Sequence, residues 1–386
     1  MYQQVKLDEL CVHKIETISS DENGLIDYFD IASIDNRKKK IISHQSLKIE
    51  EAPSRAKQIV QLNDILVSTV RPNLNAIAMV DNKTKNKMVA STGFCVLRAS
   101  EKIEPRYLFY FVQSPTFINS MTAQATGASY PAVSNSIVKS SHIPLPDLST
   151  QRRIADTLDK VSEGIEVCRR ILGELDLMVK AKFQEMFGAL GEDKFNWGMT
   201  TLGVCCELNP KRPRDIPDDM DVSFVAMPSV TEKGQIDTSV IKPYSEVRKG
   251  FTYFAEDDVL FAKITPCMEN GKGCVAKGLT NAIGAGSTEF HVLRPICGKS
   301  NPYWLYYLTV IPGFRENARK VMTGTGGQLR VPITYLDNLP VSLPPIELQE
   351  QFATFVSKTD KSRLTIQQVL SKMEMEKLAL MQEYFK

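Results

Sequence analysis

The sequence predicts an α+β protein built from two tandem copies of one module, each a mixed α/β domain followed by a long helix. Three observations support this fold class. The order of sequence blocks repeats once along the 386 residues, short β-branched and aromatic runs fill the first part of each copy, and a proline-free amphipathic stretch follows them. We therefore expect two separate cores, each in a domain of ordinary size.

The composition is that of a folded protein without a membrane segment. Hydrophobic residues make up 43% and charged residues 24% of the chain, and no apolar run reaches the roughly 18 residues that a membrane span requires. Met1 to Leu10 lack the pattern of a secretory signal, so we expect a cytoplasmic protein with reduced cysteines. A net charge of +2 excludes nucleic-acid binding through overall charge, so any such contact must be local.

The repeat has a nearly constant spacing. Gln151, in the segment LPDLSTQ, recurs as Gln349 in LPPIELQ, and Phe187 recurs as Phe385, in both cases 198 residues later. Further blocks recur in the same order, with Asp64–Pro72 matching Asp258–Pro266, Ser91–Arg98 matching Ser287–Arg294, and Tyr107–Val112 matching Trp304–Val310. These blocks predict domains at residues 1–148 and 189–346, followed by helices at residues 149–188 and 347–386.

The first helix is predicted from its apolar period. Ser149 or Thr150 is a suitable N-cap, and Gly188 is a suitable stop. Apolar residues alternate steps of four and three, which is the seam of a coiled coil. The first seam is Ile154, Leu158, Val161, Ile165, Cys168, Leu172, Leu175 and Val179, and the second keeps Phe352, Val356, Ile366, Leu370 and Met373.

Two features interrupt the regular helix pattern. Thr359 and Arg363 replace the apolar residues that the first seam has at the equivalent positions, which indicates either a role in partner choice or an imperfect amphipathic helix. Gly164 and Gly173 lie inside the first helix, where glycine costs about 1 kcal/mol relative to alanine. They indicate either chance or the close approach of another subunit's helix.

Motifs for catalysis and metal binding are incomplete. Asn209–Arg212 lacks the second proline and the aromatic residue of an amino-methyltransferase motif, and the glycines at 324–327 lack a P-loop lysine. Lys272 is followed by glycine instead of a magnesium-binding Ser or Thr. The set Cys267, Cys274, His291 and Cys297 has no familiar zinc spacing, and His13, His44 and His142 are isolated. We expect no catalysis and no metal in this chain.

The doubled pattern resembles the specificity subunit of type I restriction-modification systems. The resemblance covers nearly the whole chain, through Asp64–Pro72, Thr126-Gly127, the two LPxxxxQ segments and both helices. It implies two target recognition domains that each read half of a split DNA site, and two helices packed as an antiparallel coiled-coil spacer.

The resemblance also implies the partners. Two methyltransferase subunits would carry S-adenosylmethionine and methylate adenine N6, and restriction subunits would add ATP- and magnesium-dependent translocation and cleavage. This chain would bind double-stranded DNA and hold no cofactor. Because the two domains differ strongly in sequence, the site they read should be asymmetric.

Candidate DNA contacts are polar residues in the loops, because Lys and Arg bind phosphates and Arg, Asn, Gln and Ser read base edges. Each has the alternative reading of a solvated loop residue. In the first domain they are Arg37, Lys38, Lys39, Lys40, Arg71, Asn73, Asn75, Ser129 and Tyr130. In the second they are Lys211, Arg212, Arg214, Lys263, Asn270, Lys272, Gln328 and Arg330.

Three other functions fit less well. A specificity subunit of a related system, with nuclease and methylase fused in its partner, has the same architecture. A self-sufficient DNA methyltransferase or nuclease would need the missing motifs and would bind S-adenosylmethionine by itself. An RNA-binding or protein scaffold would show no preference for a split duplex site.

Overall fold

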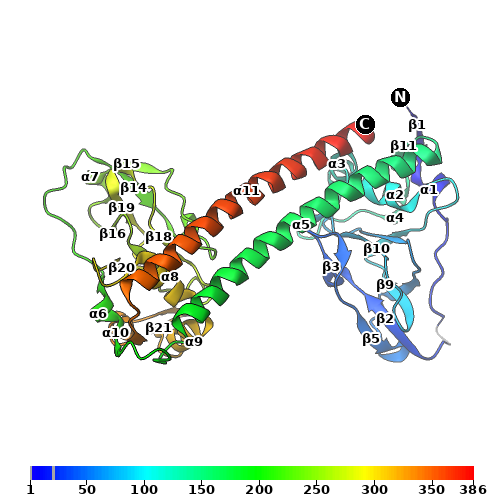
Figure 1. The fold of residues 1–386 in the computed structure, drawn as a ribbon. Helices are drawn as coiled ribbons and strands as arrows, with labels where there is room; N and C mark the ends of the chain where they lie inside the picture. Colours follow the sequence, from blue (N-terminus) through cyan, green and yellow to red (C-terminus); the bar gives the residue numbers. More distant parts are fainter. Residues whose placement is uncertain (1, 20–21) are drawn as a thin grey trace. The chain divides into compact units, whose positions relative to one another are not determined.

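The computed structural model describes residues 2–19 and 22–386, and the chain divides into two compact units. The first unit combines Met1–Ile171 with Ile366–Lys386, and the second is Leu172–Thr365. Each unit holds one mixed α/β domain and a part of each long helix. The predicted α+β class, with a long helix after each domain, is confirmed (Figure 1). The boundaries of the four predicted segments stay a prediction.

The first unit contains two main sheets, because its β-branched and aromatic runs alternate with turns. The four-stranded sheet has the order β5 (Gln45–Lys48), β2 (Leu25–Phe29), β9 (Lys87–Ser91) and β6 (Ala56–Ile59). The three-stranded sheet has the order β10 (Phe94–Leu97), β7 (Ile65–Ser68) and β8 (Ile77–Met79). Two further pairs are β1 (Gln3–Lys6) with β11 (His142–Leu145), and β3 (Ile34–Asp35) with β4 (Lys40–Ile41).

The second unit repeats this plan. Its four-stranded sheet β15 (Ile241–Pro243), β14 (Asp221–Val225), β19 (Ile283–Gly286) and β16 (Thr252–Ala255) also has a parallel central pair, β14 with β19, as β2 pairs with β9 in the first unit. The other sheet is β13 (Cys206–Leu208), β20 (Phe290–Pro295), β17 (Val259–Ala262) and β18 (Gly273–Val275). Two pairs complete it, β12 (Met199–Thr201) with β23 (Pro340–Ser342), and β21 (Thr323–Thr325) with β22 (Gln328–Arg330).

Short helices cover the sheets, and two long helices follow the domains. Those of the first unit are α1 (Leu7–Leu10), α2 (Pro105–Phe111), α3 (Pro115–Gln124) and α4 (Asn135–Lys139). Those of the second are α6 (Leu202–Cys205), α7 (Tyr244–Val247), α8 (Pro302–Val310), α9 (Pro312–Lys320) and α10 (Ile333–Asp337). The long helices are α5 (Leu148–Phe187) and α11 (Ile346–Tyr384). Among the described residues, no helix has the length and apolar character needed to cross a membrane.

The N-cap predicted for α5 is wrong by two or three residues. The carboxylate of Asp147 accepts hydrogen bonds from the backbone N–H and the hydroxyl of Thr150, at 3.0 and 2.9 Å. An ionised aspartate is favoured there because it satisfies free N–H groups and faces the positive end of the helix dipole. Gly188, with a φ of +79°, follows the last helical residue as expected.

In both units the ends of the long helices complete a core. In the first unit, Ile154 and Leu158 of α5 are buried with Phe385, which directly follows α11 and whose ring lies 5.1 Å from that of Tyr107. In the second unit, Phe352 of α11 packs against Phe183 and Phe187 of α5, each at 5.4 Å between ring centres. Within each unit, the start of one helix thus lies beside the end of the other, so the two helices run antiparallel.

Toward their middle, the helices pair through smaller and polar contacts. In the first unit, a Cβ on Gly164 would lie 2.1 Å from the methyl carbon of Met373, so this glycine leaves room for a side chain of the chain's own second helix. Gly173 has no neighbour within 4 Å of such a Cβ. In the second unit, Arg363 forms an ion pair with Asp176, which accounts for one polar seam residue.

Candidate nucleic-acid interface

The turn after β7 presents polar side chains from a well-anchored backbone. Arg71 and Asn75 adopt left-handed conformations on either side of a single 3₁₀ turn, Pro72–Leu74. The backbone N–H of Arg71 donates to the carbonyl of Pro131 at 2.7 Å, and the buried side chain of Asn75 donates to the carbonyl of Val112 at 3.4 Å. Asn73 is exposed between these anchors, whereas Asn75 serves the fold.

A second loop brings Tyr130 beside this turn. Thr126 and Ala132 form a β-bridge, and Ala132 also bridges Val70, so the loop is fastened to the end of β7. The guanidinium carbon of Arg71 lies 4.8 Å from the centre of the Tyr130 ring, which is 69% exposed. Ser129 is exposed next to it. We call Arg71, Asn73, Leu74, Ser129 and Tyr130 the tip of the first unit.

The basic run between β3 and β4 lies over a groove in the first unit. The carboxylate of Asp35 accepts hydrogen bonds from the backbone N–H groups of Arg37 and Lys38, which lowers its pKa. The ammonium of Lys39 turns inward, donates to the backbone carbonyl and side chain of Asn75, and has its pKa lowered to about 8 by burial. Lys39 therefore supports the neighbouring turn.

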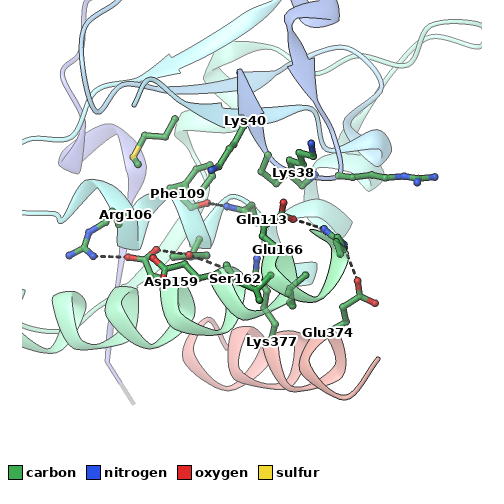
Figure 2. A pocket seen from close by; sticks show the side chains of 18 of the residues that line it. Lys38, Lys40, Arg106, Phe109, Gln113, Asp159, Ser162, Glu166, Glu374 and Lys377 are labelled. Atoms are coloured by element: carbon green, nitrogen blue, oxygen red, sulfur yellow. Dashed lines mark hydrogen bonds and ion pairs between the residues drawn. The ribbon is translucent and has the colours of Figure 1, made fainter. Parts of the chain in front are cut away.

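The groove has a volume of about 980 Å³ and is lined by both signs of charge. Figure 2 shows Lys38 and Lys40 across from α5, with Glu166 on α5 and Lys377 on α11. Burial lowers the pKa of Lys377, whose ammonium lies 5.4 Å from the ring centre of Tyr110. Arg37, Lys38 and Lys40 line this groove and are exposed to solvent, whereas Lys39 is half-buried.

In the second unit, the turn after β17 is fastened to a β-hairpin. Ile264 bridges Arg330, and the backbone N–H of Thr265 donates to the carbonyl of Leu329 at 3.0 Å. Lys263 is half-buried and its pKa is lowered by that burial. Lys272 donates to the backbone carbonyl of Met227 at 3.3 Å, so its ammonium serves a local contact.

Arg330 is paired within the protein. Its Nε donates to Oε2 of Glu289 at 2.9 Å and its Nη2 donates to Oε1 at 2.8 Å, so both edges of the fork contact one carboxylate. This hydrogen bonding lowers the pKa of Glu289. The side chains of Gln328 and Asn270 are exposed.

The basic cluster at the start of the second unit divides in the same way. Lys211 and Arg214 are exposed. Arg212 donates to the carbonyl of Phe251 at 3.2 Å, and its guanidinium lies 5.6 Å from the ring centre of Tyr244. Lys211 and Arg214 are therefore the members of the cluster whose charges face solvent.

The cysteines and the histidine whose spacing fits no familiar zinc set lie in different environments. Cys274 is buried, Cys297 is exposed, and across residues 2–19 and 22–386 no three His, Cys, Asp or Glu side chains group as a metal site. The Nε2–H of buried His291 donates to the carbonyl of Val331 at 2.9 Å, and its Nδ1 lies 3.2 Å from the side-chain nitrogen of Asn209. Burial lowers the pKa of His291 to about 4, so the imidazole is neutral.

Sequence reasoning missed the role of two glutamines. Oε1 of Gln151 accepts the backbone N–H of Glu104 at 2.8 Å, and Nε2 donates to the carbonyl of Pro146 at 2.8 Å. Gln349 makes the same contacts with Asn301 and Pro344, at 2.8 Å each. Each buried amide fastens the start of a long helix to its domain, and recurrence at the 198-residue spacing was the signal.

A buried ion pair was missed in the same way. Nε and Nη2 of Arg98 donate to the two carboxylate oxygens of Asp64 at 2.8 and 2.7 Å. Arg294 and Asp258 repeat the geometry at the same distances. In the sequence these four residues are only members of matching blocks. A buried, bidentate pair explains why both copies keep an aspartate and an arginine at these positions.

A family model, the type I restriction modification DNA specificity domain, matches the chain twice, at residues 1–177 and 196–375. Among curated relatives, the EcoAI specificity subunit of Escherichia coli is 38% identical over 199 residues, covering 48% of this chain and 33% of that protein. The EcoEI specificity subunit of the same organism is 36% identical over 205 residues, covering 50% and 34%. The match therefore spans about a third of the length of these two relatives.

Solved structures show the same fold. A chain from a study of complex assembly and conformational transition of the type I R-M system has a TM-score of 0.62 and 24% identity, covering all of this chain and 97% of that one. The type I S subunit from M. genitalium has a TM-score of 0.54 and 14% identity, covering 100% and 96%.

The double match settles the family. Its description is that of a DNA-recognition domain, which agrees with the expectation of a non-catalytic subunit. Since the two matches together cover most of the chain and fall on the two repeated modules, the protein belongs to the type I restriction-modification DNA specificity family.

Proposed function

We propose that the chain is the DNA-binding specificity subunit of a type I restriction-modification complex and reads an asymmetric, bipartite duplex site. One observation carries this proposal. The two units share the strand order of the sheet with the parallel central pair and their buried anchors, yet they differ in the side chains at equivalent turns, with Arg71 and Tyr130 at one and Lys263 and Arg330 at the other. One scaffold with two different reading surfaces suits two different half-sites.

The exposed polar residues suit local DNA contact by a nearly neutral protein. Arg71, Asn73 and Ser129 in the first unit, and Asn270 and Gln328 in the second, carry donors and acceptors suited to base edges. Lys211 and Arg214 supply charge for phosphates, which fix position and not sequence. With a net charge of +2, affinity would come from these patches and not from a general attraction.

The long helices would receive the partner subunits. Single exposed apolar residues are ordinary, but their concentration on two helices is typical of a protein interface. Those on α5 are Val167, Leu177 and Met178, and those on α11 are Leu364, Val369, Met375 and Leu378. We propose two methyltransferase subunits acting at adenine N6, joined by restriction subunits, with S-adenosylmethionine, ATP and magnesium bound by these partners.

Co-expression with the methyltransferase tests the proposal. The chain with its methyltransferase subunits should methylate adenine in one split, asymmetric duplex sequence, while the methyltransferase alone should show no such sequence preference. The chain alone should bind no S-adenosylmethionine and modify no DNA. Saturable cofactor binding by the chain alone, or methylation with the same sequence preference without it, would contradict the proposal.

A further inference from the structure

The tip of the first unit contains Arg71, whose guanidinium group has no carboxylate partner among the described residues. Within that part of the chain, its one recorded side-chain contact is the face of Tyr130. Arg330, beside the equivalent turn of the second unit, has its fork filled by Glu289, and Arg98 and Arg294, at the other end of the strands, have theirs filled by aspartates. Arg71 thus keeps the edge of its guanidinium available to a ligand.

The orientation of this guanidinium is prepared before any ligand arrives. A cation resting on an aromatic face keeps the donors along its edge free, because the contact uses the face of the ring. The backbone beneath it is held by the Arg71 N–H to Pro131 contact at 2.7 Å and by the buried Pro72. Arg71 has a φ of +49°, a conformation that side chains other than glycine and asparagine seldom adopt and that collects at functional sites.

A forked donor can bind a phosphate or a base edge, and holding it in one fixed orientation suits the base, whose acceptors have fixed directions. A phosphate can be bound by a flexible lysine as a point charge, whereas guanine presents O6 and N7 in one plane to two parallel N–H groups. Exposed Leu74 and Tyr130 flank Arg71 with apolar surface, which excludes water when a duplex is bound. The environment therefore favours a directional contact.

We propose that Arg71 is the specificity-determining residue for one guanine in the first half-site, contacted through O6 and N7, and that Tyr130 positions it. The inference rests on the proposed DNA-reading function and deepens it by naming a base and the residue that reads it. Arg330, the arginine beside the equivalent turn of the second unit, does not read a base in this way, because the carboxylate of Glu289 occupies its guanidinium donors.

The test measures the base preference at each position of both half-sites. It uses the whole chain bound to its methyltransferase subunits and a pool of duplexes in which each position is varied in turn. Arg71→Ala should lower the preference for guanine at one position of one half-site by roughly ten- to a hundredfold. Arg71→Lys should restore only part of it. Tyr130→Phe should keep the preference, and Tyr130→Ala should lower it at the same position.

Two controls separate base reading from charge loss and from misfolding. Arg55→Ala removes an exposed arginine from the same unit and should leave every base preference unchanged. The other positions of the first half-site report whether the first unit of each variant is folded, since their base preferences should stay intact, and the second half-site reports the same for the second unit. If Arg71→Ala weakens all sequences equally and lowers the slope of log affinity against log salt by about one, Arg71 contacts phosphate and the inference is overturned. If the parent complex has no base preference in either half, the proposed function itself fails.

Discussion

One loop of the module borders a groove in the first unit, whereas the equivalent loop packs against its own domain in the second unit. Between β3 and β4, Ile34 pairs with Ile41, and the basic run of this loop lies over a groove of about 980 Å³. In the second unit, the equivalent loop is closed by the β-bridge between Val230 and Ile236 and is one residue shorter. It packs against the domain. A Cβ on Gly234 would lie 2.5 Å from the Tyr306 hydroxyl oxygen.

The difference shows which parts of the module are fixed and which vary. The strand order of the sheet with the parallel central pair, the buried Asp–Arg pair and the helix-fastening glutamine are the same in both units. Loops carry the differences, because a loop can change length and charge without disturbing buried contacts. If this division holds, substitutions in shared contacts should cost both units alike, and substitutions in loops should not.

The largest effect is expected at the shared ion pair. Asp64→Ala and Asp258→Ala each leave an arginine without its carboxylate in a mostly buried place, and each should lower the unfolding free energy of its own unit by about 3 kcal/mol. Urea unfolding of the two variants measures this, with exposed Asp219→Ala as the control expected to cost little. A large cost in one unit and none in the other would mean that the scaffold is not shared.

The second unit should lose stability in mild acid through His291. Its folded pKa of about 4 lies below the ordinary value of 6.5, so the unfolded chain takes up a proton first as the pH falls. Stability is therefore fully present above pH 6.5 and is lost toward pH 4, by about 2 kcal/mol between pH 7 and pH 5. His291→Gln keeps a donor for Val331 and should flatten this part of the pH profile.

The first unit provides the contrast for that measurement. Cys95 occupies the position equivalent to His291 and, because burial raises its pKa to about 12, it stays a neutral thiol across this range. Cys95→Ser should leave the shape of the pH profile unchanged. A parent-minus-variant difference of similar size for both substitutions would assign the acid sensitivity to other groups.

The loop of the second unit should tolerate substitution less well than the equivalent loop of the first unit. Gly234→Ala places a Cβ against Tyr306 at a φ of +79°, so we expect a loss of about 1–2 kcal/mol from the second unit. Lys38→Ala, at the equivalent place over the groove, should change stability by less than about 0.5 kcal/mol. Thermal unfolding would measure both, and equal costs would show that the first loop is packed as firmly as the second.

Periodic features were predictable from the sequence, whereas partners of single side chains were not. The repeat and the two long helices follow from spacing alone, because the helical period and a nearly constant offset leave few alternatives. Lys39 and Arg330 look like other basic loop residues in sequence, yet one turns inward to Asn75 and the other is held by Glu289. Their partners lie 36 and 41 residues away in the chain, a distance that local patterns do not report.

The account's central claim, that each unit reads its own half-site, is tested most directly by replacing one domain. Residues 1–148 would be exchanged for the matching segment of another family member, and the adenine methylation pattern of cells expressing the hybrid with its methyltransferase would be sequenced. The account predicts a new sequence in one half-site, with the other half and the gap unchanged. A hybrid that is active and alters both halves, or neither, would contradict it.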